Sequence, residues 1–334
     1  MKRLWLICVG LLLLVMACGC GGRETLSQNE LRSMGQEEQT QRELAYEVLD
    51  EAGRRLSFQE KPKRIASLTY GTDEILTDLV DMKRIVAYSR WAGDPEITFI
   101  TKEQARKVGC KLQENTEAVL AVRPDLVVVS AAMSNEVIGS LEAMGLKVYV
   151  ASRPKNYEQM QQKVLKLAEA VGEKEKGEAI IRQMDQRMAK LEAKLSQIPE
   201  AKRRTVVAFN FISAMGRKGD LIDNMLTMAH VVNGVAQIPS EYTNNYISKE
   251  QVVRINPDIF LLPTWNYDNR QDLDGYAKQI KFDPAYKDVK AIKNNQIKFV
   301  SDKYRYVASH HIVDTIENFA QAVYPEVFRG DKFW

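Results

Sequence analysis

One short phrase occurs twice in this chain, and it constrains the fold more than any other feature of the sequence. Residues 117–129 read EAVLAVRPDLVVV, and residues 250–262 read EQVVRINPDIFLL. The two copies align without a gap, half a chain apart, so that Glu117 pairs with Glu250 and Asp125 with Asp258. Chance similarity between two generic turns is the weaker explanation, because several positions match in register.

Each copy predicts a short helix, a turn and a buried strand. The glutamate falls in the first helical turn, where a carboxylate complements the positive end of the helix. The residue before proline is disfavoured in helical geometry, so the helix ends there. In the second copy, Ser248 and Gln251 have the spacing of a capping box. Two such units predict two lobes of similar topology.

The rest of the chain alternates in the same way, after an expected hairpin over residues 45–58 that turns at Asp50–Gly53. Strands are expected at residues 64–70, 84–89, 125–130, 147–152, 204–211, 258–264 and 296–302. Helices are expected at residues 72–80, 116–122, 135–145, 220–232, 272–280 and 309–324. Continuous apolar strands between helices indicate parallel sheets covered on both faces, so we predict an α/β fold with two doubly wound, Rossmann-like lobes.

A long charged helix separates the two halves. Residues 157–172 predict one helix, and residues 173–198 predict a second whose apolar positions recur near helical spacing. Such a helix is a natural connector, although it can also cover the surface of one lobe. The predicted domains are an N-terminal lobe at 46–172, a linking helix at 173–198 and a C-terminal lobe at 199–334.

The N-terminus has the pattern of an export signal. A basic start is followed by an apolar run to residue 17, which is too short for a stable membrane anchor but suits a signal peptide. The run ends in LVMACGC, which resembles a bacterial lipobox with Cys18 as the lipidated residue. Cys20 and an ordinary secretory signal are the alternatives. Residues 18–45 are polar and predict a flexible tether between the membrane and the folded lobes.

Composition and motifs exclude several classes of function. Lys and Arg total 47 against 44 Asp and Glu, so no basic surface indicates nucleic acid. The chain has three histidines, of which His310 and His311 are adjacent and His230 is alone. Adjacent residues on one helix diverge by about 100°, so we expect no metal site. Nucleophile-elbow, dinucleotide, Walker and zinc-protease motifs are absent from the sequence, which favours a binding protein over an exported enzyme.

The ordered motifs resemble one known family. In chain order they are LDEAGRRLSF, KPKRIASL, TDEILTDL, RIVAYS, TEAVLAVRPDLVVV, LEAMGLKVYV, SKEQVVRINPDIFLL, DPAYKDVKAIKNNQI and AVYPEVF. Together they are similar to the solute-binding proteins of ABC importers for ferric siderophores, haem and vitamin B12, over residues 46–330. The resemblance implies two α/β lobes joined by one helix, a ligand cleft between them, and a lipid-anchored monomer that delivers its ligand to a permease dimer and its ATPase.

In that family a glutamate on each lobe pairs with permease arginines, which by position implies docking roles for Glu117 and Glu250. The alternative is a helix-end carboxylate worth about 0.3–1 kcal/mol. The sequence departs from the family pattern near His230 and Asn295, where glycine is usual. These departures affect the assignment to a subfamily rather than the fold.

The expected ligand cleft lies beyond the carboxyl ends of the strands. The residues expected there are Tyr70, Arg90, Trp91, Arg217, Trp265, Tyr267, Tyr304 and Arg305. Aromatic rings with arginines suit a large ring-bearing or anionic iron chelate. A ferric siderophore is the main expectation, with haem or cobalamin as alternatives and no resident cofactor. For haem, the candidate axial ligands are Tyr70, Tyr304, Tyr306 and His310.

Overall fold

The computed structural model describes residues 46–113, 115–239, 246–265 and 272–329. Leu44–Trp334 form one compact unit. The predicted signal peptide, Cys18, the tether and Tyr267 lie outside the described residues. Among the helices that are described, none is long and apolar enough to cross a membrane.

The unit begins with the expected hairpin. Strands β1 (Tyr46–Leu49) and β2 (Arg55–Phe58) pair antiparallel. Asp50 closes the turn, because its carboxylate accepts the backbone N–H and the guanidinium of Arg54. Gly53 has φ +75°, a value that favours glycine.

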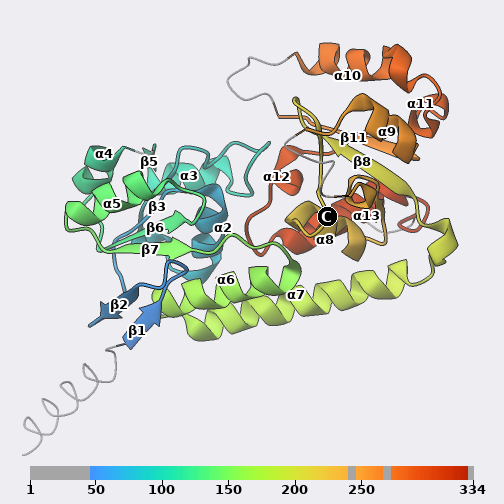
Figure 1. Ribbon diagram of the computed structural model, residues 1–334. Coiled ribbons are helices and arrows are strands. Elements are labelled where there is room, and N and C mark those ends of the chain that lie inside the picture. The colour runs from blue at the N-terminus through green and yellow to red at the C-terminus, as the bar shows by residue number, and fades with distance from the viewer. Residues whose placement is uncertain (1–45, 114, 240–245, 266–271, 330–334) are drawn as a thin grey trace, which may run out of the picture. The chain divides into compact units, whose positions relative to one another are not determined.

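The N-terminal lobe holds a parallel sheet with the strand order β5-β4-β3-β6-β7 (Figure 1). Its strands are β3 (Ile65–Ser67), β4 (Ile85–Ser89), β5 (Lys111–Leu112), β6 (Leu126–Ser130) and β7 (Val148–Ala151). Its helices are α2 (Tyr70–Leu79), α3 (Lys102–Val108), α4 (Thr116–Ala121), α5 (Asn135–Ala143) and α6 (Tyr157–Ala170). Both faces are covered, since Leu126 and Val128 pack with α2 and α6 while Val127 and Val129 pack with α4 and α5.

The C-terminal lobe holds a second sheet with the order β10-β8-β11-β12, and β9 pairs antiparallel with β8. Its strands are β8 (Thr205–Phe209), β9 (Ala214–Met215), β10 (Val232–Asn233), β11 (Ile259–Leu262) and β12 (Ile297–Phe299). Its helices are α8 (Leu221–Met228), α9 (Lys249–Ile255), α10 (Leu273–Phe282), α11 (Lys290–Lys293), α12 (Asp302–Arg305) and α13 (Ile312–Val323). Short 3₁₀ turns lie at Met82–Arg84, Glu200–Lys202, Val235–Gln237 and Pro284–Tyr286.

The two sheets have matching topology, as the repeated phrase predicted. The order β4-β3-β6-β7 in one lobe corresponds to β10-β8-β11-β12 in the other, and all these pairs are parallel. In β11, Ile259 and Leu261 face the core with α8 and α13, while Phe260 and Leu262 face the core with α9 and α10. This double coverage explains why both copies of the phrase end in unbroken apolar runs.

The aspartate of the repeated phrase joins the two central strands of each sheet by hydrogen bonds. Asp125 accepts the backbone N–H groups of Lys63 and Arg64, just before β3, at 2.7 and 2.9 Å. Asp258 accepts the N–H of Thr205, the first residue of β8, at 2.8 Å. The phrase therefore connects each short helix to the central strand of its lobe.

The helices of the phrase end before the proline, at Ala121 in α4 and at Ile255 in α9, and the residue before each proline adopts a left-handed conformation. Arg123 has φ 47° and Asn256 has φ 49°. The capping box of Ser248 and Gln251 at the start of α9 is also confirmed.

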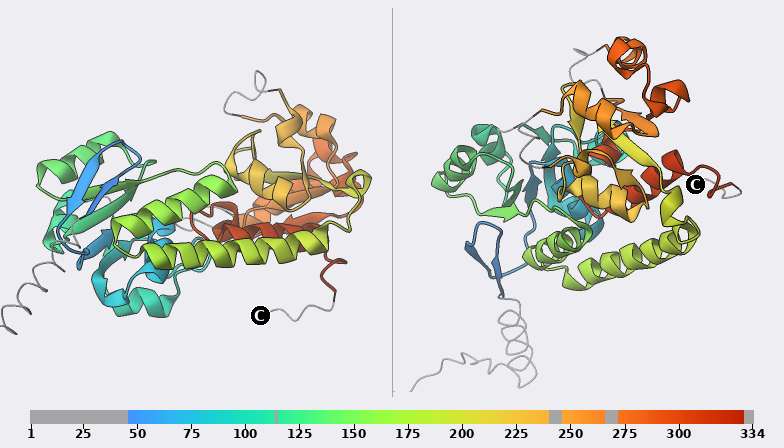
Figure 2. Two further views of the ribbon diagram at one scale, coloured as in Figure 1. Left: turned by 90° about the horizontal axis from the view of Figure 1, so that it is seen from below. Right: turned by 45° about the vertical axis from the view of Figure 1, so that its right-hand side comes forward.

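The long connecting helix is α7 (Lys174–Leu195), which packs beside α6 (Figure 2). Gly177 allows this approach, since a Cβ there would lie 2.5 Å from the Cβ of Ala168. Ile180 and Ile181 contact the cores of both lobes, so α7 links the lobes and also covers their surface. The exact domain boundaries given above stay a prediction.

The observed limits differ most from the expected ones in two helices. The helix expected at 220–232 ends at Met228, because His230 turns the chain with φ 57° before β10. The helix expected at 309–324 begins at Ile312, so His310 and His311 lie in the preceding turn. The prediction that these two histidines diverge assumed that both lie in a helix, and that assumption is wrong.

Candidate functional site

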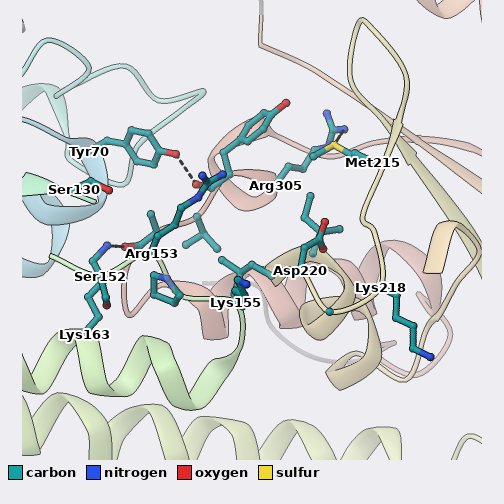
Figure 3. A pocket seen from close by; sticks show the side chains of 17 residues that line it. Tyr70, Ser130, Ser152, Arg153, Lys155, Lys163, Met215, Lys218, Asp220 and Arg305 are labelled. Carbon is teal, nitrogen blue, oxygen red and sulfur yellow. Dashed lines mark hydrogen bonds between the residues drawn. The ribbon is translucent and has the colours of Figure 1, made fainter. Parts of the chain in front are cut away.

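A cavity of about 570 Å³ lies between the lobes (Figure 3). The N-terminal lobe lines it with Tyr70 after β3, Ser130 at the end of β6, and Ser152 and Arg153 after β7. The C-terminal lobe contributes the segments 215, 218–222 and 305–308. The cavity thus lies at the carboxyl ends of the strands, where ligands bind in α/β sheets.

The charged residues of the lining are mainly cationic. Its charged members are Arg153, Lys155, Lys163, Lys218 and Arg305, with Asp220 as the acid. Arg153 and Lys155 are exposed, and within the part of the chain that the structure describes neither forms an ion pair. Their charges are therefore available to a ligand that carries negative charge.

Tyr70 joins the two lobes at the cavity wall. It is the first residue of α2, and its hydroxyl donates a hydrogen bond to the Tyr306 carbonyl at 2.8 Å. Burial raises the pKa of Tyr70 well above its usual range, so the side chain stays a neutral donor.

Lys163 forms a second link between the lobes. It projects from α6, is 3 % exposed, and donates to the Ala308 carbonyl at 2.7 Å. Burial lowers the pKa of Lys163 to about 8, although the nearby Glu74 carboxylate acts in the opposite direction. Sequence reasoning missed this residue. The available signal was a lysine on the apolar face of its helix, between Met160 and Leu167.

Arg305 lines the cavity but already has partners within the protein. It is 2 % exposed, and its guanidinium donates to Asp302 at 2.9 Å and to the Phe209 carbonyl. Asp302 in turn accepts the backbone N–H groups of Thr264 and Trp265. The expected ligand residue Arg305 thus also organises the loop after β11.

A second cluster of expected ligand residues lies at a direct contact between the lobes. Trp91 and Trp265 meet edge to face with ring centroids 5.2 Å apart, and Arg90 lies 4.0 Å over the Trp91 ring. The Trp265 indole donates to Asp94 at 3.2 Å. Next to it, Thr264 donates to Glu96 at 2.8 Å. These aromatic residues and Arg90 are not among the residues that line the cavity.

The remaining expected ligand residues lie elsewhere. Tyr304 packs against Phe99, which stacks on His311 with centroids 4.1 Å apart. Arg217 does not line the cavity; it is half-buried, and its backbone N–H donates to the cavity residue Asp220. The structure thus brings Tyr70 and Arg305 together in the cavity and separates them from the tryptophans.

The two predicted docking glutamates are both exposed and occupy equivalent positions. Glu117 lies in the first turn of α4, and Glu250 in the first turn of α9. Hydrogen bonds from its own backbone N–H and from Ser248 lower the pKa of the Glu250 carboxyl. Neither side chain lines the cavity between the lobes.

Comparison with known proteins agrees with this architecture. A family model described as periplasmic binding protein matches residues 65–304. "Probable siderophore-binding lipoprotein YfiY" of Bacillus subtilis (strain 168) is 23 % identical over 335 residues, which cover 95 % of this chain and 98 % of that protein. The Fe(3+) dicitrate-binding periplasmic protein FecB of Escherichia coli (strain K12) is 24 % identical over 265 residues, covering 75 % and 80 %.

A solved structure shows the same fold. The periplasmic heme-binding protein RhuT from Roseiflexus sp. RS-1, in apo form, superposes with a TM-score of 0.63 at 20 % identity, covering 78 % of this chain and 99 % of that one. These relatives are binding proteins and not enzymes, which agrees with the absence of catalytic motifs in the sequence. The matching family model, which spans most of the chain, shows that the protein belongs to the periplasmic binding protein family.

Proposed function

We propose that the protein captures an anionic iron chelate, foremost a ferric siderophore or ferric citrate, in the cavity between its lobes. The observation that carries the proposal is the cationic lining at the carboxyl ends of both sheets. Its volume of about 570 Å³ is in the usual range of small-molecule sites. The names of two relatives, a siderophore-binding lipoprotein and an Fe(3+) dicitrate-binding protein, support this ligand class.

The charge pattern favours a ligand with exposed carboxylate or catecholate oxygens. Arg153 offers a planar set of donors, and Lys155 a second positive charge, at the N-terminal side of the cavity. Ser130 and Ser152 add neutral hydroxyl groups beside them. Asp220 on the opposite lobe is the acid in this lining, so the cavity attracts anions overall.

Haem is the second candidate, supported by the structural neighbour RhuT, which is named as a heme-binding protein. Of the four possible axial ligands, Tyr304 packs against Phe99 and His310 pairs with Asp78, and neither lines the cavity. Tyr70 and Tyr306 do line it, but burial raises the pKa of both phenols, which opposes a phenolate ligand. Cobalamin is the further alternative.

Delivery follows from the same proposal. Lipidation at Cys18 would anchor the protein, as a monomer, at the outer side of the cell membrane. There Glu117 and Glu250 would dock on a permease dimer. The ATPase of the importer would drive that permease. The symmetry of the two exposed glutamates, one in each lobe, supports this assignment.

Ligand titration tests the proposed function. The purified full chain in detergent is titrated with ferric citrate, a ferric catecholate, a ferric hydroxamate, haem and cobalamin while tryptophan fluorescence is followed. Trp91 and Trp265 report on the lobe contact because they meet there. We expect the anionic ferric chelates to bind far below millimolar concentration. If none of the iron complexes binds below millimolar concentration, the proposal is overturned.

A further inference from the structure

Three side chains outside the cavity converge at the junction of the lobes. Asp78 projects from the last turn of α2, while His310 and His311 come from the turn before α13. One ligand atom from each lies within 4.8 Å of the others. The Nε2 atom of His310 is 2.8 Å from Oδ2 of Asp78, and the two imidazole rings have centroids 4.4 Å apart.

The convergence depends on the chain not being helical at the two histidines. Helix α13 starts at Ile312, so the angle of about 100° between helical neighbours does not apply to them. Phe99 stacks on His311 at 4.1 Å and fixes the plane of that ring. Adjacent histidines thus present their rings side by side, with planes 34° apart.

His311 is also held in the orientation of a metal ligand. Its Nδ1 atom is 2.8 Å from Oδ2 of Asp314, and Arg187 donates to the other oxygen of Asp314 at 2.8 Å. Asp314 is thus held between the imidazole of His311 and the guanidinium of Arg187. A carboxylate on one ring nitrogen leaves the other nitrogen with its lone pair, as in carboxylate–histidine–metal arrangements.

We propose that Asp78, His310 and His311 bind a divalent transition-metal ion, zinc foremost, which fastens the two lobes together. Two imidazoles and one carboxylate form a ligand set that zinc accepts, with water in the fourth position. Zinc bonds of about 2.0–2.1 Å place tetrahedral ligand atoms roughly 3.3 Å apart. The His310–Asp78 pair would open by about half an ångström, and ligand atoms as far apart as 4.8 Å would close by about 1.5 Å. The half-exposed Asp78 side chain, 52 % accessible, leaves room for entry of the ion and for water.

The proposed metal site is separate from the ligand cavity but belongs to the same lobe junction. None of its three ligands lines the cavity. The neighbouring Ser309 donates to Glu74 of α2 at 2.5 Å, and Lys163 donates to the Ala308 carbonyl. A bound ion would add a further link between the N-terminal lobe and the segment before α13, beside those made by Tyr70, Glu74 and Lys163.

Zinc titration of the purified full chain tests the site, with zinc chloride as the probe. We expect one zinc ion per chain in calorimetry at pH 7.5 and a rise of the melting temperature with zinc concentration. The protein has three histidines, so imidazole NMR resonances can be assigned singly. Zinc should shift the His310 and His311 resonances and leave those of His230 unchanged. Shifts confined to His230, or no saturable binding at millimolar zinc, would overturn the proposal.

Variants assign the ligands. His310→Gln and His311→Gln should each lower zinc affinity at least about ten-fold. His230→Gln is the matched control, because His230 also contacts a carboxylate, Glu192, but belongs to no such cluster in the described residues. If a variant fails to fold, the histidine resonances of the wild-type chain still decide the question. Retention of wild-type zinc affinity by a folded His310→Gln, His311→Gln double variant would also overturn it.

Discussion

Three buried or partly buried polar residues link the lobes in this molecule. Tyr70, Glu74 and Lys163 all belong to the N-terminal lobe, and each donates to or accepts from the segment 306–309 of the C-terminal lobe. Gly71 lets the two segments approach, because a Cβ there would lie 2.6 Å from Ala308. A buried polar group is stabilising only while its partner is present, so each of these residues depends on the lobe contact.

Lys163 makes a pH-dependent contribution to stability that can be measured. Its pKa is 10.5 in the unfolded chain and about 8 in the folded protein, so the unfolded state binds the extra proton between these values. The free energy of unfolding should therefore rise with pH from about 8 towards 10.5, by roughly 3 kcal/mol at most. Urea unfolding at pH 7.5, 8.5 and 9.5 measures it.

The control for this prediction is Lys163→Met, which keeps the length of the side chain and removes the charge. Tyrosines also titrate near the upper end of this window, so the quantity to compare is the difference between the two proteins. The free energy of unfolding of the wild type, minus that of Lys163→Met, should increase as the pH rises. Equal slopes in both proteins would show that Lys163 is not the titrating group.

At the level of elements, the order of strands and helices follows from the sequence, but several limits do not. The alternation was predictable because β6 and β11 are buried on both faces and read as unbroken apolar runs. The limits of α8 and α13 were missed because a left-handed residue, His230, and a turn at His310–His311 interrupt helical patterns. Such interruptions are set by tertiary contacts and carry little periodic signal.

The aspartate and the glutamate of the repeated phrase have different roles, which measurements of stability can distinguish. Asp125→Ala removes the acceptor for two backbone N–H groups before β3, so we expect a loss of about 1–2 kcal/mol in the free energy of unfolding. Asp258→Ala removes the acceptor for one backbone N–H, that of Thr205 at the start of β8, and should cost about 1 kcal/mol.

The control is Glu117→Gln, in the first turn of α4, which should cost under about 1 kcal/mol because this exposed carboxylate acts only on the helix end. All three variants are compared by urea unfolding. A loss at Glu117 as large as that at Asp125 would mean that the glutamate also has a structural role.

For the whole molecule, the sequence predicted that the site lies at the carboxyl ends of the strands. It did not predict which residues line the cavity. Strand ends pointed to Tyr70 and Arg305, which do line the cavity. The tryptophans follow strands in the same way, yet they contact each other across the lobes. The way the two lobes meet decides which residues contact each other and which remain available to a ligand. The periodicity of the sequence within one lobe does not show how the lobes meet.

Removal of the cavity cations should weaken ligand binding. The double variant Arg153→Gln, Lys155→Gln should bind ferric citrate roughly ten-fold more weakly at low salt, at about 1 kcal/mol or less for each exposed charge. Its affinity should also depend less on ionic strength than that of the wild type. Lys190→Gln, an exposed lysine on α7, is a single-charge control and should bind normally. Unchanged affinity in the double variant would exclude these two side chains from the ligand site.

Ligand capture and delivery should be separable, because the proposed docking residues Glu117 and Glu250 do not line the cavity. In cells, charge reversal by Glu117→Arg with Glu250→Arg should abolish most uptake of the iron complex, because the new arginines would repel the permease arginines that the proposed docking requires. Ligand affinity of the purified double variant should stay at the wild-type value, as neither glutamate lines the cavity. Glu103→Arg is the matched control, because Glu103 also lies exposed in the first turn of a short helix, α3. It should leave uptake intact, and a loss of uptake equal to that of the double variant would mean that the repeated phrase has no special part in docking.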